Sequence, residues 1–477
     1  MTENAYVKNQ VERKDHWNRI AVQENHTMRC NGYYHRRLQE VYSFLIPPGR
    51  RIIDIGCGKG DLLAALKSSY GVGVDFSSDM ILKAQQRHPE LRFLDQDAHE
   101  LNVHEKFDVV ILSDLVNDLW DVQRVLENVY TVATPETRLI LNMYSRIWEL
   151  PLRCTEKLGL STKRMEQNWL TIEDLSNLLH LADFEIVRTW QEFLCPIPLP
   201  FLGRFINTTI VKFWPFTALA LTNFIIARPR IAKRKASSSF SVAVVIPTRN
   251  EAGNIDRIFK TIPQMGERTE LIFVEGNSTD NTYGAIQEAI QRYPSRECKL
   301  FKQEGKGKGD AVRLGFSKTT ADILMVFDAD LTVPPQDLPR FYHAIALGKG
   351  EFINGVRLVY PLEKQAMQLL NMIANKLFGI LFSWLLGQAM RDTLCGTKVL
   401  WRSDYETIAK NLSYFGDFDP FGDFDLLFGA AKLNLKIIEI PIRYKERTYG
   451  TTNISRWRHG VLLFRMVAFA LNKIKFV

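Results

Sequence analysis

Short apolar runs rich in β-branched residues recur along the chain and alternate with longer amphipathic stretches. Such runs occupy residues 52–55, 71–75 and 107–112 in the first half. After a break near residue 235, the same alternation begins again with the apolar run 242–246. Buried strands that alternate with helices are typical of parallel sheets covered by helices. The pattern therefore predicts an α/β protein with two domains in series.

A charged seam separates the two halves. Residues 228–235 read RPRIAKRK, with five positive charges in eight positions, and Ala236 and three serines follow. Small residues after a run of charges are typical of a linker. The predicted boundaries are a helical extension over 1–29, a first domain over 30–227, a linker over 228–239, a second domain over 240–455 and a basic amphipathic helix over 456–477.

Composition narrows the class of protein. Hydrophobic residues make up 46% of the chain and charged residues 24%, which is usual for globular proteins. The net charge of +8 suits an anionic substrate or a membrane surface and does not require nucleic acid. The six cysteines form no CxxC pair, so we expect reduced thiols rather than disulfides or a zinc site.

No segment has the pattern of a signal peptide or a membrane-spanning helix. The N-terminus is polar, and the longest uncharged runs, 213–227 and 377–390, hold 15 and 14 residues. A spanning helix needs about 18 or more apolar residues. We therefore expect a cytoplasmic protein, peripheral on the inner face of the membrane if it contacts one.

A glycine-rich turn follows the first apolar run. Asp54 stands two residues before Gly56, and Gly58 and Gly60 complete a GxGxG spacing. The next apolar run ends in Asp75, 21 positions after Asp54. Together with the segments Phe93–Ala98 and Phe107–Asp114, this order of strand ends resembles the class I S-adenosylmethionine-dependent methyltransferases. The resemblance covers about residues 30–227 and implies a Rossmann-like fold.

The resemblance implies a role for each of these residues. Asp54 and the three glycines would surround S-adenosylmethionine, Asp75 would accept hydrogen bonds from its ribose, and Asp97 would hold its adenine amino group. Asp108 is expected to be a residue of the strand start. Two alternatives stay open for Asp114 and Asn117, which either touch the sulfonium or substrate or cap the next helix. His99 and His104 are either a catalytic base or two exposed loop histidines.

The methyl acceptor is less defined. Leu141–Tyr144 stands where enzymes of this fold that methylate nucleic-acid amino groups carry Asn-Pro-Pro-aromatic, which counts against that chemistry. The stretch 193–224 is rich in proline and aromatic residues. It either covers an apolar acceptor as a lid or packs around the last strands, expected over 218–227.

The second half opens with two apolar runs, each of which leads into a polar motif. The run Val242–Ile246 leads into Pro247, Thr248, Arg249, Asn250 and Glu251, and a second run leads into Glu275–Thr282. These segments resemble the family 2 glycosyltransferases, which have the GT-A fold. The resemblance implies that Pro247, Asn250, Glu251 and Glu275 bind the nucleotide. Glu275 replaces the usual first Asp, and Gly276 and Asn277 also depart from the pattern, which leaves the base of the donor open.

Two further segments of this half carry phosphate and metal chemistry. Gly305–Arg313 places glycines beside lysines, a composition that suits a pyrophosphate, with Lys308 near the diphosphate. An apolar strand over 323–327 then ends in Asp328 and Asp330. Carboxylates and phosphate oxygens are the preferred ligands of Mg²⁺ or Mn²⁺. We predict that both aspartates bind such an ion, which would stabilise the leaving nucleoside diphosphate.

Later segments point to a branch of this family. Asn354–Arg357, Asp392–Lys398 and Glu439–Gly450 resemble the polyprenyl-phosphate branch, which includes dolichyl-phosphate mannosyltransferase. The resemblance covers about residues 240–460 and implies that Arg357 and Arg447 hold a lipid phosphate. Other members often append C-terminal membrane helices, and this sequence shows none.

A six-residue repeat, FGDFDP followed by FGDFDL over 415–426, leaves two alternatives. Asp423 or Asp425 is either a base that deprotonates a sugar hydroxyl or a cap of a helix that starts near Leu426. A membrane contact is indicated by the apolar segment 365–390 and by the basic, aromatic tail 443–477. The alternative is a core helix with a solvated basic face.

These patterns together predict a bifunctional enzyme. Its second domain would transfer a sugar from a nucleotide-sugar to a lipid phosphate with inversion and a divalent cation, and its first domain would methylate a glycan or glycolipid. The alternatives are transfer to a sugar hydroxyl of a polysaccharide, and a scaffold with one inactive domain. Nucleic acid is not expected as a partner.

Overall fold

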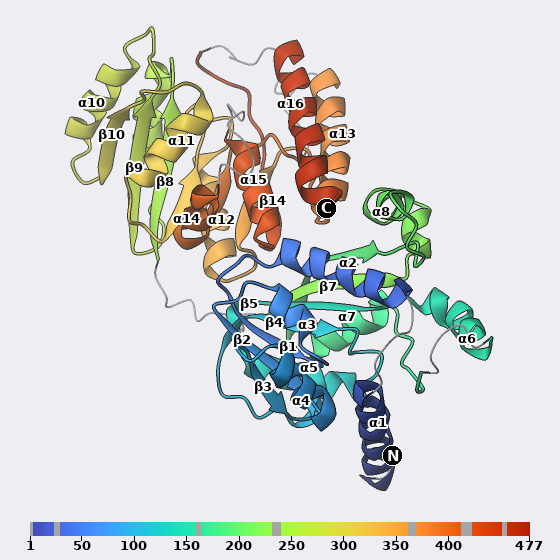
Figure 1. Cartoon of the computed structure of the whole chain (residues 1–477). Helices are drawn as coiled ribbons and strands as arrows, with labels where there is room; N and C mark the ends of the chain where they lie inside the picture. The colour runs from blue at the N-terminus through green and yellow to red at the C-terminus, as the bar shows by residue number, and fades with distance from the viewer. Residues whose placement is uncertain are drawn as a thin grey trace. The chain divides into compact units, whose positions relative to one another are not determined.

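The computed structural model describes residues 3–22, 29–158, 164–230, 240–360, 369–411, 422–450 and 456–477. The chain forms two compact units, one of residues 1–230 with 476–477 and one of residues 231–475 (Figure 1). Each unit contains one seven-stranded sheet. The expected linker lies mostly in 231–239, outside the described residues.

The first unit is built on a mixed sheet. Its strand order is β3-β2-β1-β4-β5-β7-β6, and only the pairs β5–β7 and β6–β7 are antiparallel. The strands are β1 (Arg51–Ile55), β2 (Tyr70–Asp75), β3 (Arg92–Asp95), β4 (Phe107–Ser113), β5 (Ala133–Tyr144), β6 (Phe184–Glu192) and β7 (Thr222–Pro229). The last strands were expected over 218–227, but 216–219 form a 3-10 turn and β7 begins at Thr222.

Helices cover both faces of this sheet. Ile52 and Ile53 belong to different buried clusters, as expected when neighbouring strand residues point to opposite faces. This explains why the strands read as continuous apolar runs. The helices are α1 (Glu3–Val22), α2 (Arg29–Leu45), α3 (Asp61–Ala65), α4 (Ser78–Arg87), α5 (Val122–Thr131), α6 (Glu149–Lys157), α7 (Ile172–Leu181) and α8 (Leu202–Thr208).

The second unit repeats this plan with different connections. Its strand order is β10-β9-β8-β11-β13-β12-β14, and β13 runs antiparallel to both of its neighbours. The strands are β8 (Ser241–Thr248), β9 (Arg268–Glu275), β10 (Cys298–Lys302), β11 (Ile323–Val326), β12 (Phe352–Val356), β13 (Lys398–Trp401) and β14 (Ile437–Pro441). Two buried clusters again lie on opposite sides of the sheet, so both faces are covered.

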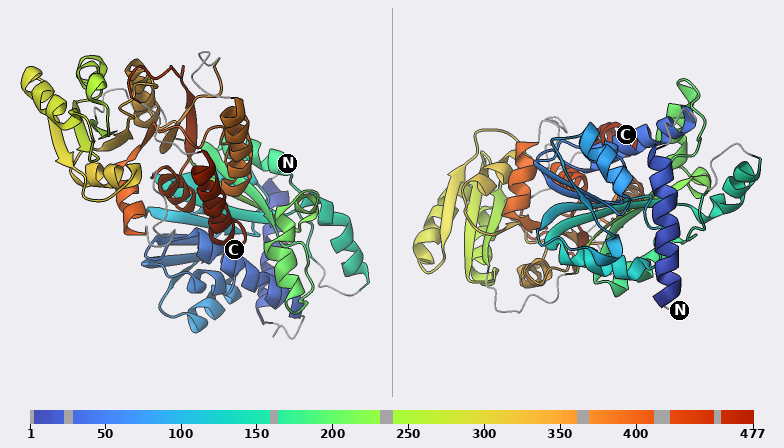
Figure 2. Two further views of the ribbon diagram at one scale, coloured as in Figure 1. Left: turned by 90° about the horizontal axis from the view of Figure 1, so that it is seen from above. Right: turned by 60° about the horizontal axis from the view of Figure 1, so that its bottom comes forward.

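The helices of the second unit include a neighbouring pair. Helices α13 and α16 lie side by side (Figures 1 and 2), and the rings of Phe378 and Phe464 are 5.3 Å apart. The helices are α9 (Ile255–Thr261), α10 (Thr282–Arg292), α11 (Lys308–Ser317), α12 (Leu338–Ala346), α13 (Leu369–Leu386), α14 (Arg402–Lys410), α15 (Asp423–Lys432) and α16 (Arg456–Ala470). Across the described residues, no helix is both long and apolar enough to cross a bilayer.

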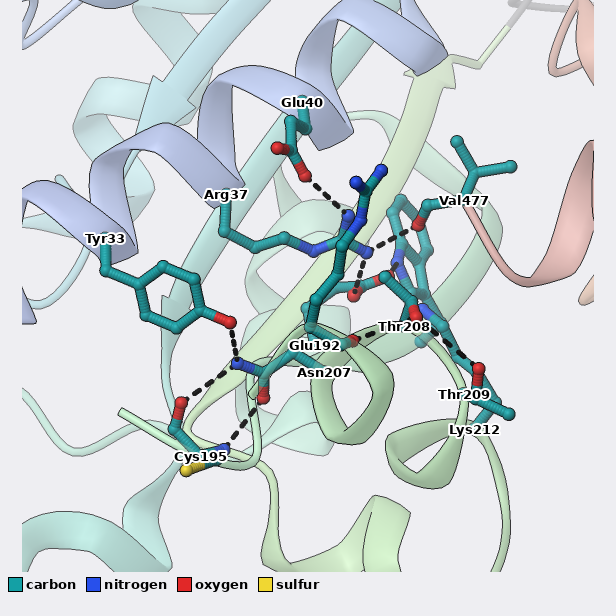
Figure 3. A network of polar contacts seen from close by, with 12 residues as sticks. Tyr33, Arg37, Glu40, Glu192, Cys195, Asn207, Thr208, Thr209, Lys212 and Val477 are labelled. Carbon is teal, nitrogen blue, oxygen red and sulfur yellow. Dashed lines mark hydrogen bonds and ion pairs between the residues drawn. The ribbon is translucent and has the colours of Figure 1, made fainter. Parts of the chain in front are cut away.

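A polar network anchors the irregular segment between β6 and β7 in the first unit. Asn207 donates to the carbonyl of Cys195 at 2.9 Å and to the Tyr33 hydroxyl at 3.0 Å, and it accepts from the Cys195 amide at 2.8 Å (Figure 3). Nearby, buried Glu192 pairs with Arg37 at 3.1 Å and with Lys212. These contacts fix the segment to the sheet and to α2.

The same segment presents apolar side chains to solvent. Phe201 is 95% exposed and Trp214 is 84% exposed. We call residues 197–219 the apolar segment. Its exposed members are Ile197, Leu199, Phe201, Leu202, Phe205, Phe213, Trp214, Phe216 and Leu219. Large contiguous areas of exposed apolar side chains are unusual on soluble proteins, so this group of side chains is a candidate contact surface.

Candidate functional site

The glycine turn after β1 is shaped by packing at two positions and open at the third. Gly56, Gly58 and Gly60 all have positive φ angles of 79°, 53° and 77°. A Cβ atom on Gly56 would lie 2.8 Å from Leu115, and one on Gly60 would lie 2.7 Å from Phe93. A Cβ on Gly58 would meet nothing within 4 Å. The turn is therefore tight against the fold and open on the side of Gly58.

Asp75 is tied to this turn. Its Oδ2 accepts a 2.9 Å hydrogen bond from the Gly58 amide, and its Oδ1 accepts one from the Ser77 amide at 2.9 Å. Burial raises the pKa of Asp75 to about 6, although these two amides act in the opposite direction. The carboxylate thus lies beside the open face of the turn, where the resemblance implies a ribose.

Asp54 lies beneath the turn with an unsatisfied oxygen. The residue is 1% exposed, and Oδ1 has no hydrogen-bond partner among the described residues. Burial, followed by the charge of Asp75, raises its pKa to about 7. A buried oxygen without a partner is costly unless a ligand or water supplies a donor. Together with the open side of Gly58, this oxygen fits a bound cofactor that carries hydrogen-bond donors.

The structure corrects the expectation that His99 is exposed. His99 is buried, its Nε2 accepts from the Asp121 amide at 3.1 Å, and its Nδ1 lies 2.7 Å from Asp97 Oδ1. Because an amide donates to Nε2, the ring proton is on Nδ1 and points at Asp97. Burial would raise the pKa of Asp97, but the hydrogen bonds from His99 outweigh it and lower the pKa. His104 is exposed, as expected.

Capping by Asp114 or Asn117 is also wrong. Helix α5 is capped by Asp121, whose side chain accepts from the Arg124 amide at 3.0 Å. The Asn117 side chain instead pairs with backbone groups, accepting from the Tyr144 amide at 3.0 Å and donating to the Asn168 carbonyl at 2.8 Å. Asp114 has a positive φ of 54° and stands at the end of β4. Asp108 lies within β4, where its carboxylate accepts from the Arg51 amide at 2.9 Å.

In the second unit, the expected nucleotide residues lie at the ends of two adjacent strands. Pro247 lies in β8 opposite Val274 of β9, and Asn250 follows with a positive φ of 58°. Asn250 Oδ1 accepts from the Thr279 amide at 2.8 Å, and Glu275 Oε1 accepts from the Ser278 amide at 2.5 Å. The bond of Asn250 joins the loop after β8 to the loop after β9, and the bond of Glu275 fixes the loop after β9 to the end of its own strand.

Glu251 is buried at the same edge of the sheet. Its Oε2 accepts from Asn254 at 2.7 Å and its Oε1 from Arg447 at 2.8 Å. Burial raises the pKa of Glu251 to about 7, against the opposing effect of Arg447. The carboxylate is therefore positioned by one amide and one guanidinium group.

The first aspartate of the Asp-x-Asp segment is paired with a lysine. Lys308 begins α11, and its Nζ lies 2.7 Å from Asp328 Oδ1. Burial would raise the pKa of Asp328, but Lys308 outweighs burial and lowers it. A Cβ on Gly396 would lie 1.9 Å from Asp328 Oδ2, so only glycine leaves room for this carboxylate.

The second aspartate is paired with an arginine. Asp330 Oδ1 accepts from the Thr332 hydroxyl at 2.7 Å, and Oδ2 accepts from Arg447 at 2.7 Å. Arg447 therefore bridges Asp330 and Glu251, two residues to which the sequence assigned metal and nucleoside contacts. The structure brings these three expected residues into direct contact.

The donor atoms fit a hard divalent ion. No group of three or more His, Cys, Asp and Glu side chains that could hold a metal occurs within the described ranges. The two aspartates supply carboxylate oxygens, and both are balanced here by side-chain cations rather than buried unpaired. Mg²⁺ commonly binds one or two carboxylates and completes its shell with phosphate oxygens and water. Asp328 and Asp330 are thus suited to an ion shared with a diphosphate.

Arg357 is held by a carboxylate that sequence reasoning did not single out. Its Nε and NH2 donate to Asp392 Oδ2 and Oδ1 at 2.7 and 2.8 Å, a bidentate pair, and its guanidinium lies 5.2 Å from the Tyr444 ring centre. Burial would raise the pKa of Asp392, but Arg357 holds it at about 2. The arginine is therefore rigidly oriented before any ligand binds.

The two candidate bases of the repeat face different partners. Helix α15 begins at Asp423, three residues before the expected start, and Gly422 rather than an aspartate occupies the cap position. Asp423 Oδ1 lies 3.8 Å from Lys308 and 3.5 Å from Lys398. Asp425 lies 3.4 Å from Arg313. Asp423 therefore lies beside the Lys308–Asp328 pair. The first copy of the repeat lies in 412–421, outside the described residues.

Lys398 is a further member of this cluster that was missed. Its side chain is 0% exposed, and Nζ donates to the Cys395 carbonyl at 2.6 Å and to Asn354 Oδ1 at 3.2 Å. A lysine is almost never fully buried unless it is paired. Its position in the apolar strand β13 is the signal that could have identified it.

Comparisons with known proteins agree with this division of the chain. Residues 46–190 match the family model described as Methyltransferase domain, and residues 243–408 match Glycosyl transferase family 2. These matches confirm the two resemblances and the two-domain α/β fold expected from the sequence.

Two curated relatives each match part of the chain. The undecaprenyl-phosphate 4-deoxy-4-formamido-L-arabinose transferase of Edwardsiella ictaluri is 24% identical over 230 residues, 47% of this chain and 66% of the relative. The dolichol-phosphate mannosyltransferase of Pyrococcus furiosus is 36% identical over 109 residues, 22% of this chain and 30% of the relative. The chain thus spans less than two thirds of the length of each.

Solved structures resemble each half separately. Glucosyl-3-phosphoglycerate synthase from Mycobacterium tuberculosis, in complex with Mn²⁺ and uridine diphosphate, is 19% identical, with a TM-score of 0.36 over 49% of this chain and 80% of that chain. Magnesium protoporphyrin IX methyltransferase from Synechocystis is 20% identical, with a TM-score of 0.33 over 46% of this chain and 99% of that chain.

Proposed function

Since the chain carries a methyltransferase domain followed by a family 2 glycosyltransferase domain, we propose that it is a bifunctional enzyme of lipid-linked glycan synthesis. The second domain would transfer a sugar from a nucleotide-sugar to a polyprenyl-phosphate-type lipid, and the first would methylate a glycan or glycolipid product. The observation that carries the sugar transfer is the cluster of Asp328, Asp330, Lys308 and Arg447 at the ends of the central strands.

The residues of this cluster suit the chemistry of a nucleotide-sugar. Asp328 and Asp330 would hold a divalent ion, which supplies charge neutralisation for the leaving diphosphate. Glu251 and Glu275 would bind the nucleoside, and Lys308 would face the diphosphate. An anionic phosphate oxygen of the acceptor then attacks the anomeric carbon, its bond to the diphosphate oxygen breaks, and the configuration inverts. Because that oxygen is already charged, no general base is required.

The acceptor phosphate needs cationic groups in addition to the divalent ion. Arg357 is oriented by Asp392, and Arg447 presents a planar guanidinium group at the ion site. Arginine is suited to phosphate because its planar group donates pairs of hydrogen bonds to two oxygens. The names of both curated relatives, which refer to undecaprenyl phosphate and dolichol phosphate, support a lipid phosphate as the acceptor.

A sugar hydroxyl is the second candidate acceptor, and one observation favours it. Asp423 reaches the Lys308–Asp328 cluster, where a base for a hydroxyl would be needed. Its Oδ1, however, is already paired with two lysines. We therefore favour the lipid phosphate.

Membrane contact fits the exposed apolar side chains of both units. Ile373, Leu377 and Ile380 on α13 are exposed, the last by 70%, as is Phe464 on α16. The apolar segment 197–219 adds aromatic residues and the exposed Arg204, and it contains no acidic residue. Its other basic residue, Lys212, is buried against Glu192. Apolar and aromatic groups with basic neighbours suit the interface of an anionic membrane. We propose peripheral binding at the cytoplasmic face.

The test is a transfer assay with the full-length protein. Undecaprenyl phosphate in mixed micelles, Mg²⁺ or Mn²⁺, and a panel of radiolabelled uridine- and guanosine-diphosphate sugars should give a labelled lipid that chelation with EDTA abolishes. Methyl incorporation from S-adenosylmethionine into that lipid would support the coupled function. Label found only in water-soluble glycan, with an intact protein, would overturn the lipid-phosphate acceptor in favour of the hydroxyl.

A further inference from the structure

A carboxylate without a role in sugar transfer stands at the end of β4 in the first unit. Asp114 is partly exposed, and the Tyr34 hydroxyl donates to its Oδ1 at 2.8 Å and lies 3.1 Å from its Oδ2. Asn142 Nδ2 donates to Oδ1 at 2.5 Å. With a positive φ of 54°, Asp114 also has a backbone conformation that is uncommon for a residue other than glycine. Such strain is typically kept where it positions a functional group.

The donors around Asp114 are themselves fixed. Asn142 is buried, and its Oδ1 accepts from the Tyr42 hydroxyl at 2.7 Å and from the Ser113 hydroxyl at 3.0 Å. Its amide nitrogen must therefore face Asp114. Tyr34 is buried in turn, with its hydroxyl 3.3 Å from that of Thr222. The carboxylate is thus oriented from one side by buried groups.

Asp114 and the glycine turn lie at the same edge of the sheet. Strand β4 pairs with β1, with Ile111 opposite Asp54, so Asp114 follows the same edge of the sheet. The next residue, Leu115, is the one that a Cβ on Gly56 would strike at 2.8 Å. Asp114 is therefore next to the turn at which the proposed function locates S-adenosylmethionine.

The chemistry of this carboxylate suits proton transfer. A carboxylate has about four acceptor positions, and Tyr34 and Asn142 do not occupy all of them. Burial, with a smaller effect of the charge of Asp118, raises the pKa of Asp114 to about 7, although the hydrogen bonds from Tyr34 and Asn142 act in the opposite direction. A base that titrates near neutral pH is the most effective for accepting a proton under those conditions. Tyr144, partly exposed and stacked on Tyr34 with ring centres 6.1 Å apart, provides an aromatic wall beside it.

We propose that Asp114 accepts the proton of a sugar hydroxyl during O-methylation, an inference that rests on the proposed methyltransferase function. The hydroxyl oxygen attacks the methyl carbon, the carbon–sulfur bond breaks with its electron pair returning to sulfur, and the hydroxyl proton passes to Asp114. The products are a methyl ether, S-adenosylhomocysteine and the protonated carboxyl, which then loses its proton to water. A carboxylate acceptor would need no base and would be repelled by Asp114, so the geometry selects a neutral hydroxyl.

A binding experiment tests this placement without turnover. Calorimetry on the full-length protein would compare S-adenosylmethionine, a cation, with S-adenosylhomocysteine, which lacks that charge, between pH 6 and 8. Ionised Asp114 next to the sulfonium should raise the affinity ratio of the two by roughly tenfold across this range, since about 1.4 kcal/mol corresponds to a factor of ten. The rise should be clearly smaller in Asp114→Asn, where only Asp54 and Asp75 beside the turn still titrate in this range. Asp108→Asn, at the other end of β4, should behave as the wild type.

The outcomes separate the inference from the function on which it rests. Failure of the wild type to bind S-adenosylmethionine at all would overturn the proposed methyltransferase function. Normal binding with a ratio that does not change with pH would overturn the role of Asp114 alone. If Asp114→Asn fails to fold, Tyr34→Phe provides the second test. It removes a donor to the ionised form, so the midpoint of the pH dependence should move upward, and an unmoved midpoint would contradict the inference.

Activity gives a further comparison with defined probes. Methyl hexopyranosides would serve as neutral acceptors and hexuronates as carboxylate acceptors. We expect methyl transfer to the hydroxyl probes, reduced about 10²–10⁴-fold in Asp114→Asn. Methyl ester formed on the hexuronates, or undiminished transfer in Asp114→Asn, would overturn the proposal.

Discussion

Arg447 donates a 2.7 Å hydrogen bond to Asp330 across 117 positions of sequence. Through its other terminal nitrogen it also reaches Glu251, so one guanidinium group is shared by two carboxylates that we assign to the ion and the nucleoside. A bound ion and donor would compete with Arg447 for the same oxygens. Binding should therefore rearrange this bridge and release the guanidinium group toward the acceptor.

Replacing either aspartate of the ion site should abolish sugar transfer. In Asp328→Asn and Asp330→Asn, one of two carboxylates is lost, so the ion is held less tightly and the diphosphate charge is uncovered. Transfer from nucleotide-sugar and Mn²⁺ binding by paramagnetic resonance would be measured together. The control is Asp337→Asn, whose carboxylate pairs with Arg340 outside the cluster. Unchanged transfer in both site variants would refute the metal assignment.

Arg447→Ala should strongly reduce sugar transfer if the acceptor is a lipid phosphate. A hydrogen bond to a charged group is worth about 1.5–3 kcal/mol, so we expect a loss of roughly ten- to a hundredfold in kcat/KM. Steady-state kinetics with varied lipid phosphate would measure it. Arg257→Ala is the matched control, because Arg257 contacts the neighbouring Thr448 at 2.9 Å and is exposed.

Variants of the two aspartates of α15 distinguish a hydroxyl acceptor from a lipid phosphate. Under the lipid-phosphate mechanism, Asp423→Asn and Asp425→Asn should keep much of the activity, with circular dichroism confirming the fold. A base, by contrast, is worth about 10²–10⁴ in rate. A loss of that size confined to Asp423→Asn, with a mild effect of Arg447→Ala, would count decisively against the lipid phosphate.

Asp75→Ala should weaken S-adenosylmethionine binding by roughly tenfold or more, because a charge-assisted hydrogen bond to the ribose is lost. Calorimetry on the full-length protein would measure this. Asp108→Ala is the matched control, since Asp108 accepts from the Arg51 amide at the start of β1, whereas the glycine turn follows the end of that strand. Wild-type affinity in Asp75→Ala would refute the assignment of Asp75 to the ribose.

Ionisation of Asp54 should lower the folding stability of the ligand-free protein as the pH rises. Its pKa is about 7 in the folded protein against 3.8 ordinarily, so the folded state binds the proton more tightly than the unfolded state. Stability from this group is therefore fully present below about pH 4 and is lost as the pH rises to about 7. Melting temperatures between pH 5 and 8 should fall less in Asp54→Asn than in the wild type. Parallel curves would contradict the assignment.

The sequence was most informative where a strand runs directly into a motif. A buried run followed by glycines or acidic residues leaves few conformations, so the turn at Gly56 and the positions of Asp75 and Asp328 followed from local pattern. Even the start of α3 at Asp61 was predictable, because the third glycine ends the turn.

Contacts made across the fold could not be read in this way. Tyr34 belongs to no motif, and its contact with Asp114 joins residues 80 positions apart. Buried His99 accepts a hydrogen bond from the Asp121 amide, 22 positions away in the sequence. Arg357 and Asp392 form a buried pair because two separate segments meet in the fold. Local spacing carries no information about such partners, so the sequence left His99 open between a base and an exposed loop residue and did not predict the pairing of Arg357 with Asp392.

In the apolar segment, the side chains that stabilise the fold differ from the side chains that are exposed to solvent. Its fold depends on buried polar anchors such as Asn207 and Glu192, whereas Phe201 and Trp214 are almost fully exposed. Polar replacements at these exposed positions should therefore leave the melting temperature almost unchanged while they improve solubility. Aggregation during purification and thermal stability are thus governed by different side chains of one short stretch, and each can be engineered without the other.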